Sequence, residues 1–439
     1  MRILLALVCL LGASLGLAVL ADTVPKTDDV PRSIRVIAVD GTIDPATSGY
    51  IRRAIEVANI NKDELLLIEL NTPGGLVDAT QDIITAMLAS KTPIAVYVTP
   101  EGGRALSAGT FILVSAQIAA MSPTTTTGAA TPIGGQGGED LERKVVNAME
   151  AYMRSLAEKR DRNAEWATKA VTEGISATER ESLELKVIDL IATDRDDLLK
   201  KIDGKTVTVA GEQKVTLKTA GAPVEDLPMR PQERLMHFLA NPNVIGILIL
   251  IAIYGIIGEI SNPGAIFPGV VGGIALILVF YAANLLPLNY TALALIIFAV
   301  ALFIIESQTA TTGILATGGA VALGLGLFLI VDVNDPIFRT SLSVVIPATL
   351  FTMAFFVFAI GAVLKAKKRH VTTGSQGLTG REIPARSDLD PYGKVFADGS
   401  WWTAESIGGP VKAGEMVRIV EVQGLKLVVE PVERTEEVI

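Results

Sequence analysis

Residues 65–75 read LLLIELNTPGG, an apolar run from Leu65 to Leu70 that ends in a turn with two adjacent glycines. A short apolar run bounded by turn residues is typical of a strand that is buried on both faces of a sheet. The pattern of the next segment, 77–88, predicts a helix. Strand, turn and helix in this order indicate one unit of an α/β fold.

The same alternation surrounds this unit. Residues 34–39 and 94–98 predict two more strands, and residues 45–59 predict a second helix. Buried strands that are separated by crossover helices imply a largely parallel sheet. We therefore expect one α/β domain over residues 33–220.

The composition places part of the chain in lipid. Half of the 439 residues are hydrophobic, only 19% are charged, and the mean hydropathy is +0.46, which excludes a single soluble globular domain. Apolar stretches long enough, or nearly long enough, to cross a bilayer as helices occupy residues 244–260, 265–284, 290–306, 313–331 and 343–364. We expect a polytopic α-helical membrane domain over residues 242–365 with about five spans. Because the first and third stretches are short, four spans and a re-entrant segment are the alternative.

The membrane block also contains a loose internal repeat. In each half a glutamate is followed by glycines: Glu259 with Gly264, Gly272 and Gly273, and Glu306 with Gly313, Gly318 and Gly319. A two-helix unit that is used twice would give this pattern.

The N-terminal residues have the pattern of a secretory signal. Arg2 precedes an apolar run, residues 3–20, and small residues lead to Ala21. We expect residues 1–21 to be removed as a signal peptide, and an uncleaved membrane anchor is the alternative. Cys9 is the chain's one cysteine, so cleavage would leave neither a disulfide nor a thiol nucleophile.

Charge predicts the orientation in the membrane. The basic run from Lys365 to Arg369 directly follows the last apolar stretch and marks the cytoplasmic side. An odd number of spans then places the α/β domain outside the cytoplasm, in agreement with the signal pattern.

The last part of the chain, residues 374–433, has short alternating runs at 393–397, 400–404, 416–422 and 425–429, which predict a small β-barrel. Barrels of the OB type often bind single-stranded nucleic acid, and Trp401-Trp402 could suggest this. However, residues 374–439 carry seven basic and eleven acidic side chains, and the whole chain has a net charge of −9. Since neighbouring strand residues face opposite ways, one tryptophan should pack in the barrel core. We expect a protein-interaction role and no nucleic-acid partner.

Histidine is too scarce for several kinds of active site. The chain has only His237 and His370, and neither lies in the α/β domain. A Ser-His-Asp triad or a His-ligated metal is therefore excluded there, which leaves a Ser or Thr with a Lys, or paired carboxylates.

Three features favour the serine and lysine. Gly74 and Gly75 follow a strand, where bare backbone N–H groups can face an oxyanion, although a simple tight turn is the alternative. Ser107 precedes an apolar helical stretch, so Ala108 could offer another N–H donor; the alternative is that Ser107 is only an N-cap.

The third feature is Lys144, which is expected to start an amphipathic helix whose one face carries Val145, Ala148, Met149, Tyr152 and Leu156. The helix dipole and burial would lower the pKa of such a lysine. The alternative is a solvated lysine beside Arg143. The glycine-rich residues 134–138 predict either a mobile lid or an ordinary surface loop.

Taken together, these residues resemble the NfeD family of membrane-bound serine proteases of the ClpP class. The first domain is similar to the ClpP/crotonase α/β fold in its Ser-Lys dyad version, and the last to an OB-fold-like barrel. The blocks that carry the resemblance are residues 71–75, 104–110, 128–132 and 259–264, together with Lys144. Leu106 departs from the family's smaller residue before the nucleophile, and residues 141–143 are more charged than usual.

The resemblance implies a serine endopeptidase with Ser107 as nucleophile, Lys144 as general base, and Gly74, Gly75 and Ala108 around the oxyanion. It needs no metal or cofactor. It implies membrane-protein substrates with hydrophobic segments, stomatin-like partners, and a homo-oligomer, a dimer or larger. Two other classes remain open: a non-catalytic membrane scaffold for stomatin-like assemblies, and an acyl-CoA enzyme of the crotonase superfamily.

Overall fold

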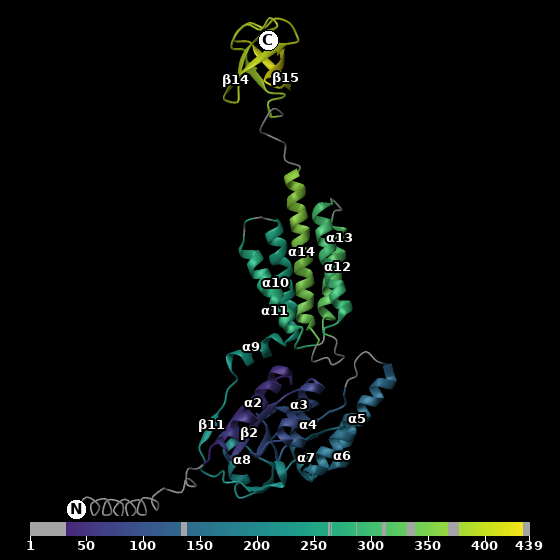
Figure 1. The fold of residues 1–439 in the computed structure, drawn as a ribbon. Coiled ribbons are helices and arrows are strands. Elements are labelled where there is room, and N and C mark those ends of the chain that lie inside the picture. The colour runs from purple at the N-terminus through teal and green to yellow at the C-terminus, as the bar shows by residue number, and fades with distance from the viewer. Residues whose placement is uncertain are drawn as a thin grey trace, which may run out of the picture. The chain divides into compact units, whose positions relative to one another are not determined.

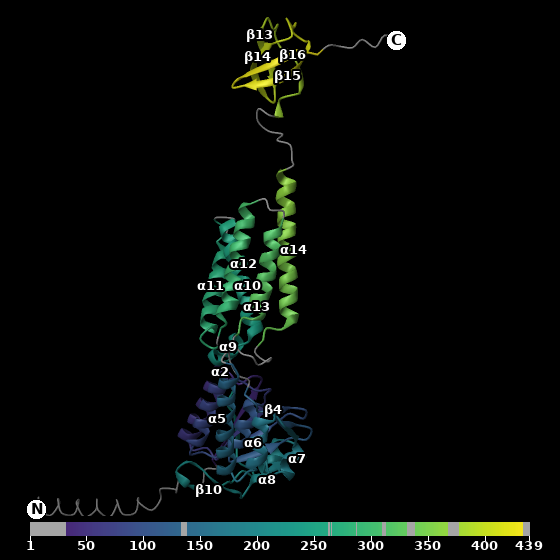
Figure 2. The same cartoon turned by 90° about the vertical axis from the view of Figure 1, so that its right-hand side faces the viewer.

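The computed structural model describes residues 32–132, 138–261, 264, 266–286, 288–309, 313–331, 339–367 and 377–432. The expected signal peptide with Cys9, most of the glycine-rich loop (134–137), the basic residues Lys368 and Arg369, and His370 lie outside these residues. The chain divides into two compact units, Met1–Met353 and Ala354–Ile439. Figures 1 and 2 show the elements in two views.

The first domain contains a six-stranded sheet in the order β11-β1-β2-β3-β5-β8, and all neighbouring strands are parallel. The strands are β1 (Ile34–Asp40), β2 (Leu65–Asn71), β3 (Ile94–Val98), β5 (Ile118–Met121), β8 (Leu190–Ile191) and β11 (Val224–Asp226). The predicted parallel α/β sheet and its first three strands are confirmed. The strand β5 and the two edge strands, β8 and β11, were not predicted, because runs of two to four residues carry little periodic pattern.

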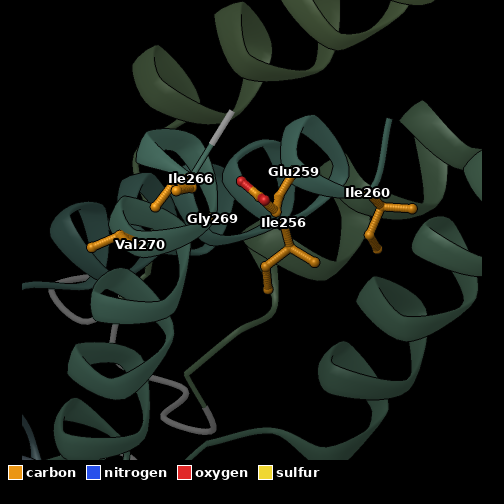
Figure 3. Close-up of a pocket in the computed structure, with 6 residues that line it drawn as sticks. All are labelled: Ile256, Glu259, Ile260, Ile266, Gly269 and Val270. Atoms are coloured by element: carbon orange, nitrogen blue, oxygen red, sulfur yellow. The ribbon is translucent and has the colours of Figure 1, made fainter. Parts of the chain in front are cut away.

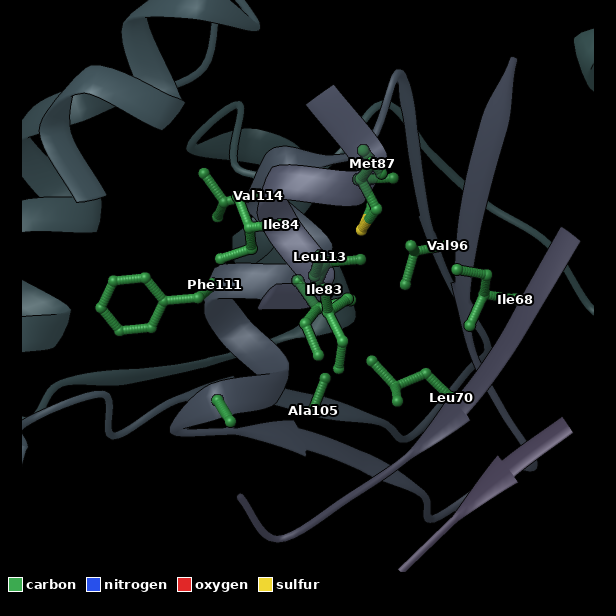
Figure 4. Packing of buried hydrophobic residues seen from close by; sticks show 14 of the residues in the cluster. Ile68, Leu70, Ile83, Ile84, Met87, Val96, Ala105, Phe111, Leu113 and Val114 are labelled. Carbon is green, nitrogen blue, oxygen red and sulfur yellow. The ribbon is translucent and has the colours of Figure 1, made fainter. Parts of the chain in front are cut away.

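Helices cover both faces of this sheet. They are α2 (Pro45–Asn61), α3 (Val77–Leu88), α4 (Ala108–Ser115), α5 (Gly138–Lys159), α6 (Ala164–Thr172), α7 (Glu179–Glu184) and α8 (Arg195–Ile202). Alternate strand residues face opposite ways, so Ile68 and Val96 pack with α3 and α4, as Figure 4 shows, whereas Leu67 and Tyr97 pack with α8. Burial on both faces explains why β2 is apolar at consecutive positions from Leu65 to Ile68.

Smaller elements complete the domain. A three-stranded sheet joins β4 (Arg104–Leu106), β6 (Thr126–Gly128) and β7 (Ser176–Thr178), and β9 (Thr206–Thr208) pairs with β10 (Lys214–Thr216), with the 3₁₀ turn η1 (Ala210–Glu212) between them. After β11 the chain forms the short helix α9 (Pro231–Leu239), which leads to the apolar helices.

Five long apolar helices follow: α10 (Pro242–Ser261), α11 (Phe267–Ala282), α12 (Tyr290–Gln308), α13 (Ile314–Phe328) and α14 (Leu342–Lys367). Over the described residues, only α10 has an apolar segment long enough to cross a membrane, and the apolar segments of the other four are shorter. α10 pairs with α11, and α12 pairs with α13, so the block contains two helical hairpins in succession.

The two glutamates of the repeat occupy matching positions in the two hairpins but make different contacts. The Glu306 carboxylate accepts hydrogen bonds from the N–H groups of Gly313, Leu315 and Ala316 at 3.0 to 3.2 Å, and so caps α13. Glu259 Oε2 is buried and has no hydrogen-bond partner among the described residues. It lines a pocket of about 420 Å³ beside Gly269, shown in Figure 3. Pro268, which has no N–H, stands where the second hairpin has Leu315.

The C-terminal unit contains a five-stranded sheet in the order β12-β15-β16-β14-β13. Its strands are β12 (Glu382–Pro384), β13 (Tyr392–Ala397), β14 (Ser400–Ser406), β15 (Met416–Gln423) and β16 (Lys426–Pro431). The four predicted strands are confirmed, and β12 was missed. Trp402 packs against the apolar core and donates from Nε1 to the Ala397 carbonyl at 3.2 Å, whereas Trp401 is exposed, as alternation predicts.

Candidate functional site

Ser107 has an unusual backbone conformation at the junction between β4 and α4. Its φ is 52° and its ψ is −115°, outside the regions that a residue with a side chain normally adopts. Such a conformation costs of order 1–3 kcal/mol and occurs mainly at functional sites. Ser107 stands at the N-cap position of α4, but its side chain makes no capping hydrogen bond. The interpretation of Ser107 as an ordinary N-cap is therefore wrong.

Several buried hydrogen bonds hold this strained junction. Ser107 N–H donates to the Gly128 carbonyl, and Thr110 N–H donates to the Ser107 carbonyl, both at 3.0 Å. The buried Thr110 hydroxyl lies 2.8 Å from the Gly128 carbonyl and 3.0 Å from that of Ala105, and it accepts from Gly128 N–H at 3.0 Å. We had not predicted a role for Thr110. Its position one helical turn after the serine is the signal that could have suggested one.

Gly74 lies directly against Ser107. Its φ is +135°, and a Cβ atom there would lie 2.8 Å from Ser107 Cβ and 3.2 Å from Ser107 Oγ. Gly75 has no room for a side chain either, since a Cβ atom would lie 2.1 Å from the Ile43 carbonyl oxygen. Both glycines are therefore required by close approach: Gly74 lies against Ser107, as expected, whereas Gly75, the next residue, lies against Ile43.

The backbone N–H groups of Gly75 and Ala108 take no part in the hydrogen bonds that hold the segments around Ser107. Two hydrogen bonds form the bridge between Ile43 and Gly75. The Ile43 N–H donates to the Gly74 carbonyl, and the Leu76 N–H donates to the Ile43 carbonyl, both at 2.9 Å. The Gly75 N–H is in neither bond. Ala108 is the first residue of α4, so its N–H has no acceptor within the helix. These two groups can serve a developing oxyanion.

Asn71, the last residue of β2, joins three segments at this edge of the sheet. Its side chain donates to Asp40 Oδ1 at 3.0 Å and accepts from Arg104 N–H at 3.0 Å, and its carbonyl accepts from Gly41 N–H at 2.9 Å. The ends of β1 and β2 and the start of β4 are thus fixed to one another. The site lies at the carboxyl end of parallel strands, where α/β folds usually carry their ligands.

Lys144 does not meet Ser107 in the part of the chain that the structure describes. It lies in the second turn of α5, which begins six residues earlier, at Gly138, so the expected helix start at Lys144 is wrong. Its side chain is exposed, and no hydrogen bond joins it to Ser107. The buried face of α5 carries Met149, Met153 and Leu156 as well as the half-buried Tyr152, whereas Ala148 is exposed, contrary to expectation.

Metal ligands do not gather in this site. Among the residues that the structure describes, no group of three His, Cys, Asp or Glu side chains could hold a metal ion.

Three descriptions of protein families match successive parts of the chain. The NfeD1b N-terminal domain matches residues 33–211, the NfeD integral membrane domain matches residues 243–362, and the NfeD-like C-terminal, partner-binding domain matches residues 375–431. Together they follow the order of domains seen in the structure.

Full-length relatives give the same result. The chain is 33% identical over 408 residues to membrane-bound protease PH1510 of Pyrococcus horikoshii, a match that covers 90% of this chain and 92% of the relative. It is 26% identical over 429 residues to membrane protein NfeD1b of Bacillus subtilis, with 91% and 92% covered.

Among solved structures, the chain is similar to 1510-N, a membrane protease specific for a stomatin homolog from Pyrococcus horikoshii. That match has 31% identity and a TM-score of 0.43, and it covers 48% of this chain and 100% of the solved one. From the family matches and the near full-length identity to the Pyrococcus relative, the chain belongs to the NfeD family.

Proposed function

We propose that this protein is a membrane-anchored serine endopeptidase in which Ser107 is the nucleophile and Lys144 is the general base. The observation that carries the proposal is the strained Ser107, whose side chain caps nothing and lies against Gly74. A hydroxyl held out of its capping role at a helix N-terminus is free for attack, and the helix dipole stabilises the negative charge that develops there. Kinship with a named membrane-bound protease supports the same activity.

In the proposed reaction, Ser107 Oγ attacks the carbonyl carbon of a peptide bond while neutral Lys144 takes the hydroxyl proton. The N–H groups of Gly75 and Ala108, next to Gly74, stabilise the oxyanion of the tetrahedral intermediate. Lys144 then delivers the proton to the leaving amine as the C–N bond breaks. Water, deprotonated by the same lysine, hydrolyses the acyl-enzyme and restores Ser107.

This mechanism requires the first turns of α5 to bring Lys144 to Ser107. In the single chain Lys144 is exposed, so we propose that substrate, or a second copy in a homo-oligomer, closes this part of α5 over the serine. A lysine that is buried on closure has a lowered pKa, as a general base needs.

The proposed substrates are hydrophobic segments of membrane proteins, with stomatin-like proteins as the partner class. The protein of the Pyrococcus structure is described as specific for a stomatin homolog, and this chain is 33% identical to the Pyrococcus protease over nearly its whole length. We further propose a multi-pass topology with the catalytic domain outside the cytoplasm and an OB-fold-like barrel inside it, in keeping with the membrane and partner-binding matches.

One observation favours a second function. Because Lys144 is exposed and makes no bond to Ser107, a non-catalytic scaffold for stomatin-like assemblies fits the single chain as well. The test compares wild type, Ser107→Ala and Lys144→Ala in lipid nanodiscs for cleavage of β-casein and of a hydrophobic stomatin-tail peptide. We expect both substitutions to lower the rate by at least about 1000-fold. Equal rates for all three folded proteins would contradict the protease and favour the scaffold.

A further inference from the structure

The helix α9 is held against the catalytic domain through two polar side chains on one of its faces, Glu233 and His237. Glu233 forms a two-pronged ion pair with Arg53 of α2 at 2.6 and 2.8 Å. One turn later, His237 Nδ1 lies 2.6 Å from Asp44 Oδ2. Residues four apart share one face of a helix, so these contacts form a single seam.

The other side of α9 is apolar. Leu235 and Phe238 are 52% and 58% exposed. The chain then passes through Asn241, whose carbonyl accepts from the N–H groups of Val244 and Ile245 at the start of α10. α9 therefore connects the catalytic domain directly to the first membrane helix.

The side chain that His237 contacts, Asp44, is almost fully buried, at 1% exposure. Its Oδ1 accepts from Thr47 N–H at 2.8 Å and so caps α2, which leaves Oδ2 to face the imidazole. A buried carboxylate needs a partner for each oxygen. His237 supplies the partner that α2 does not.

The loop that carries Asp44 also forms hydrogen bonds with the Gly74–Gly75 segment, which holds a proposed oxyanion donor. Ile43 precedes Asp44, and its N–H and carbonyl bond to the Gly74 carbonyl and the Leu76 N–H. Gly75 is packed so tightly against Ile43 that no side chain would fit. A shift of the loop therefore moves Gly74 and Gly75 with it.

We propose that His237 is a positioning residue that holds residues 41–44, and through Ile43 the Gly74–Gly75 segment, to the helix that enters the membrane. This inference rests on the proposed protease function for its kinetic consequence. The anchor in the membrane thereby sets the geometry of the oxyanion donors, although His237 itself touches no reacting atom.

Charge adds a pH dependence to this contact. The hydrogen bond from His237 to Asp44 raises the pKa of the imidazole against the opposing effect of burial. The other charged groups on the packed faces of α9 and α2, Glu233 and Arg53, are paired with each other. Because the folded-state pKa is raised, the stabilisation is complete below the unfolded pKa of about 6.5 and is lost as the pH rises through the raised value.

The kinetic test uses the full-length protein in nanodiscs with three variants. His237→Gln removes the charge, and Asp44→Asn keeps an N-cap oxygen for Thr47 but removes the opposite charge. Glu233→Gln is the matched control, since it breaks the other α9 contact without touching residues 41–44. We expect the first two to lower kcat about threefold to tenfold, a part of the loss that removing one oxyanion donor gives. KM should be unchanged in both variants. The double variant, His237→Gln with Asp44→Asn, should have a kcat no lower than that of either single variant, and the kcat of the control should lie within about twofold of wild type.

The pH profile separates positioning from a general loss of structure. The ratio of wild-type to His237→Gln kcat cancels the pH dependence that the two proteins share and should fall toward one as the pH rises. A constant ratio at all pH values would overturn the proposal.

A readout without catalysis separates this inference from the protease proposal. Amide hydrogen exchange of peptides covering residues 41–44 and 74–76 should quicken at least threefold in His237→Gln and Asp44→Asn, but not in Glu233→Gln. His237 and His370 are the chain's only histidines, so the imidazole signal that is absent from His237→Gln identifies His237 in an NMR titration. Unchanged exchange at residues 74–76 in folded His237→Gln would refute the positioning role, even if the protein proved not to be a protease.

Discussion

At the scale of single residues, the site depends on a close approach that only glycine permits. Ser107 is held in a strained conformation, and the space beside its Cβ and Oγ atoms is filled by the backbone of Gly74. The strain is retained because buried hydrogen bonds from Ser107 and Thr110 fix the surrounding backbone. A structural serine would gain nothing from this arrangement.

Gly74→Ala tests this packing. We expect at least a 100-fold loss of peptidase activity, because the new methyl group must displace Ser107. Gly102→Ala is the matched control, since Gly102 also has a positive φ, +76°, but has open space around its Cβ position. Both variants strain the backbone, but Gly74→Ala adds the clash with Ser107 and should lower the melting temperature more, so activity is compared at a temperature where both proteins are folded. A similar loss of activity in both would contradict a specific role for Gly74.

The sequence indicated this residue-scale site only in part. The glycine pair, the serine and the absence of histidine from the domain were visible in the sequence. They left a Ser or Thr with a Lys, or paired carboxylates, and favoured the serine and lysine. The positive φ of Ser107 and the brace from Ile43 to Gly75 were not visible, because they depend on segments that are distant along the chain.

At the scale of elements, the repeated hairpins show how a buried charge is accommodated. Glu306 is enclosed by N–H groups at the start of α13, where the helix dipole also favours a negative group. Glu259 has the same place in the first hairpin, but Pro268 stands at the position of Leu315 and has no N–H to donate to it. One carboxylate thus fastens its hairpin, and the other does not.

Glu306→Ala should therefore destabilise the membrane domain by about 2 to 4 kcal/mol, because one buried and two partly buried N–H groups lose their acceptor. Glu259→Ala is the matched control and should cost less than about 1 kcal/mol, since no bond to a described residue is lost. Thermal unfolding in one detergent compares the two. Equal destabilisation would show that the capping bonds of Glu306 contribute no net stability.

Element prediction succeeded where periodicity was long and failed where it was short. The buried strands β1 to β3 and the five apolar helices were recognised from their runs of side chains. The start of α5 was misplaced because the residues before Lys144 are glycine-rich and charged and carry no apolar period. The strands β8, β11 and β12 depend on tertiary pairing rather than on their own sequence.

At the scale of the whole molecule, the domains occur in an order that suits proteolysis at a membrane. An α/β domain is followed by a connecting helix, apolar helices and a small sheet domain, and the family matches follow the same order. Tethering to the bilayer raises the local concentration of other membrane proteins as substrates.

Single cysteines can test the proposed orientation, because Cys9 is the chain's only cysteine and lies in the segment expected to be cleaved. Lys205→Cys lies in the catalytic domain and Ser400→Cys in the C-terminal sheet, both at exposed positions. In intact cells, or spheroplasts where an outer barrier exists, a membrane-impermeant maleimide should label the first and not the second. Permeabilised cells are the control and should label both, and the reverse pattern in intact cells would contradict the proposed topology.

Covalent trapping most directly tests whether Ser107 is the nucleophile. The full-length protein in nanodiscs is treated with a hydrophobic peptidyl fluorophosphonate, and the adduct is located by mass spectrometry of the digested chain. We predict one adduct, on Ser107, that is absent from Ser107→Ala and forms much more slowly in Lys144→Ala. Unmodified Ser107 in a preparation that loses its peptidase activity to the probe, or an adduct on another residue, would show that the nucleophile has been misassigned.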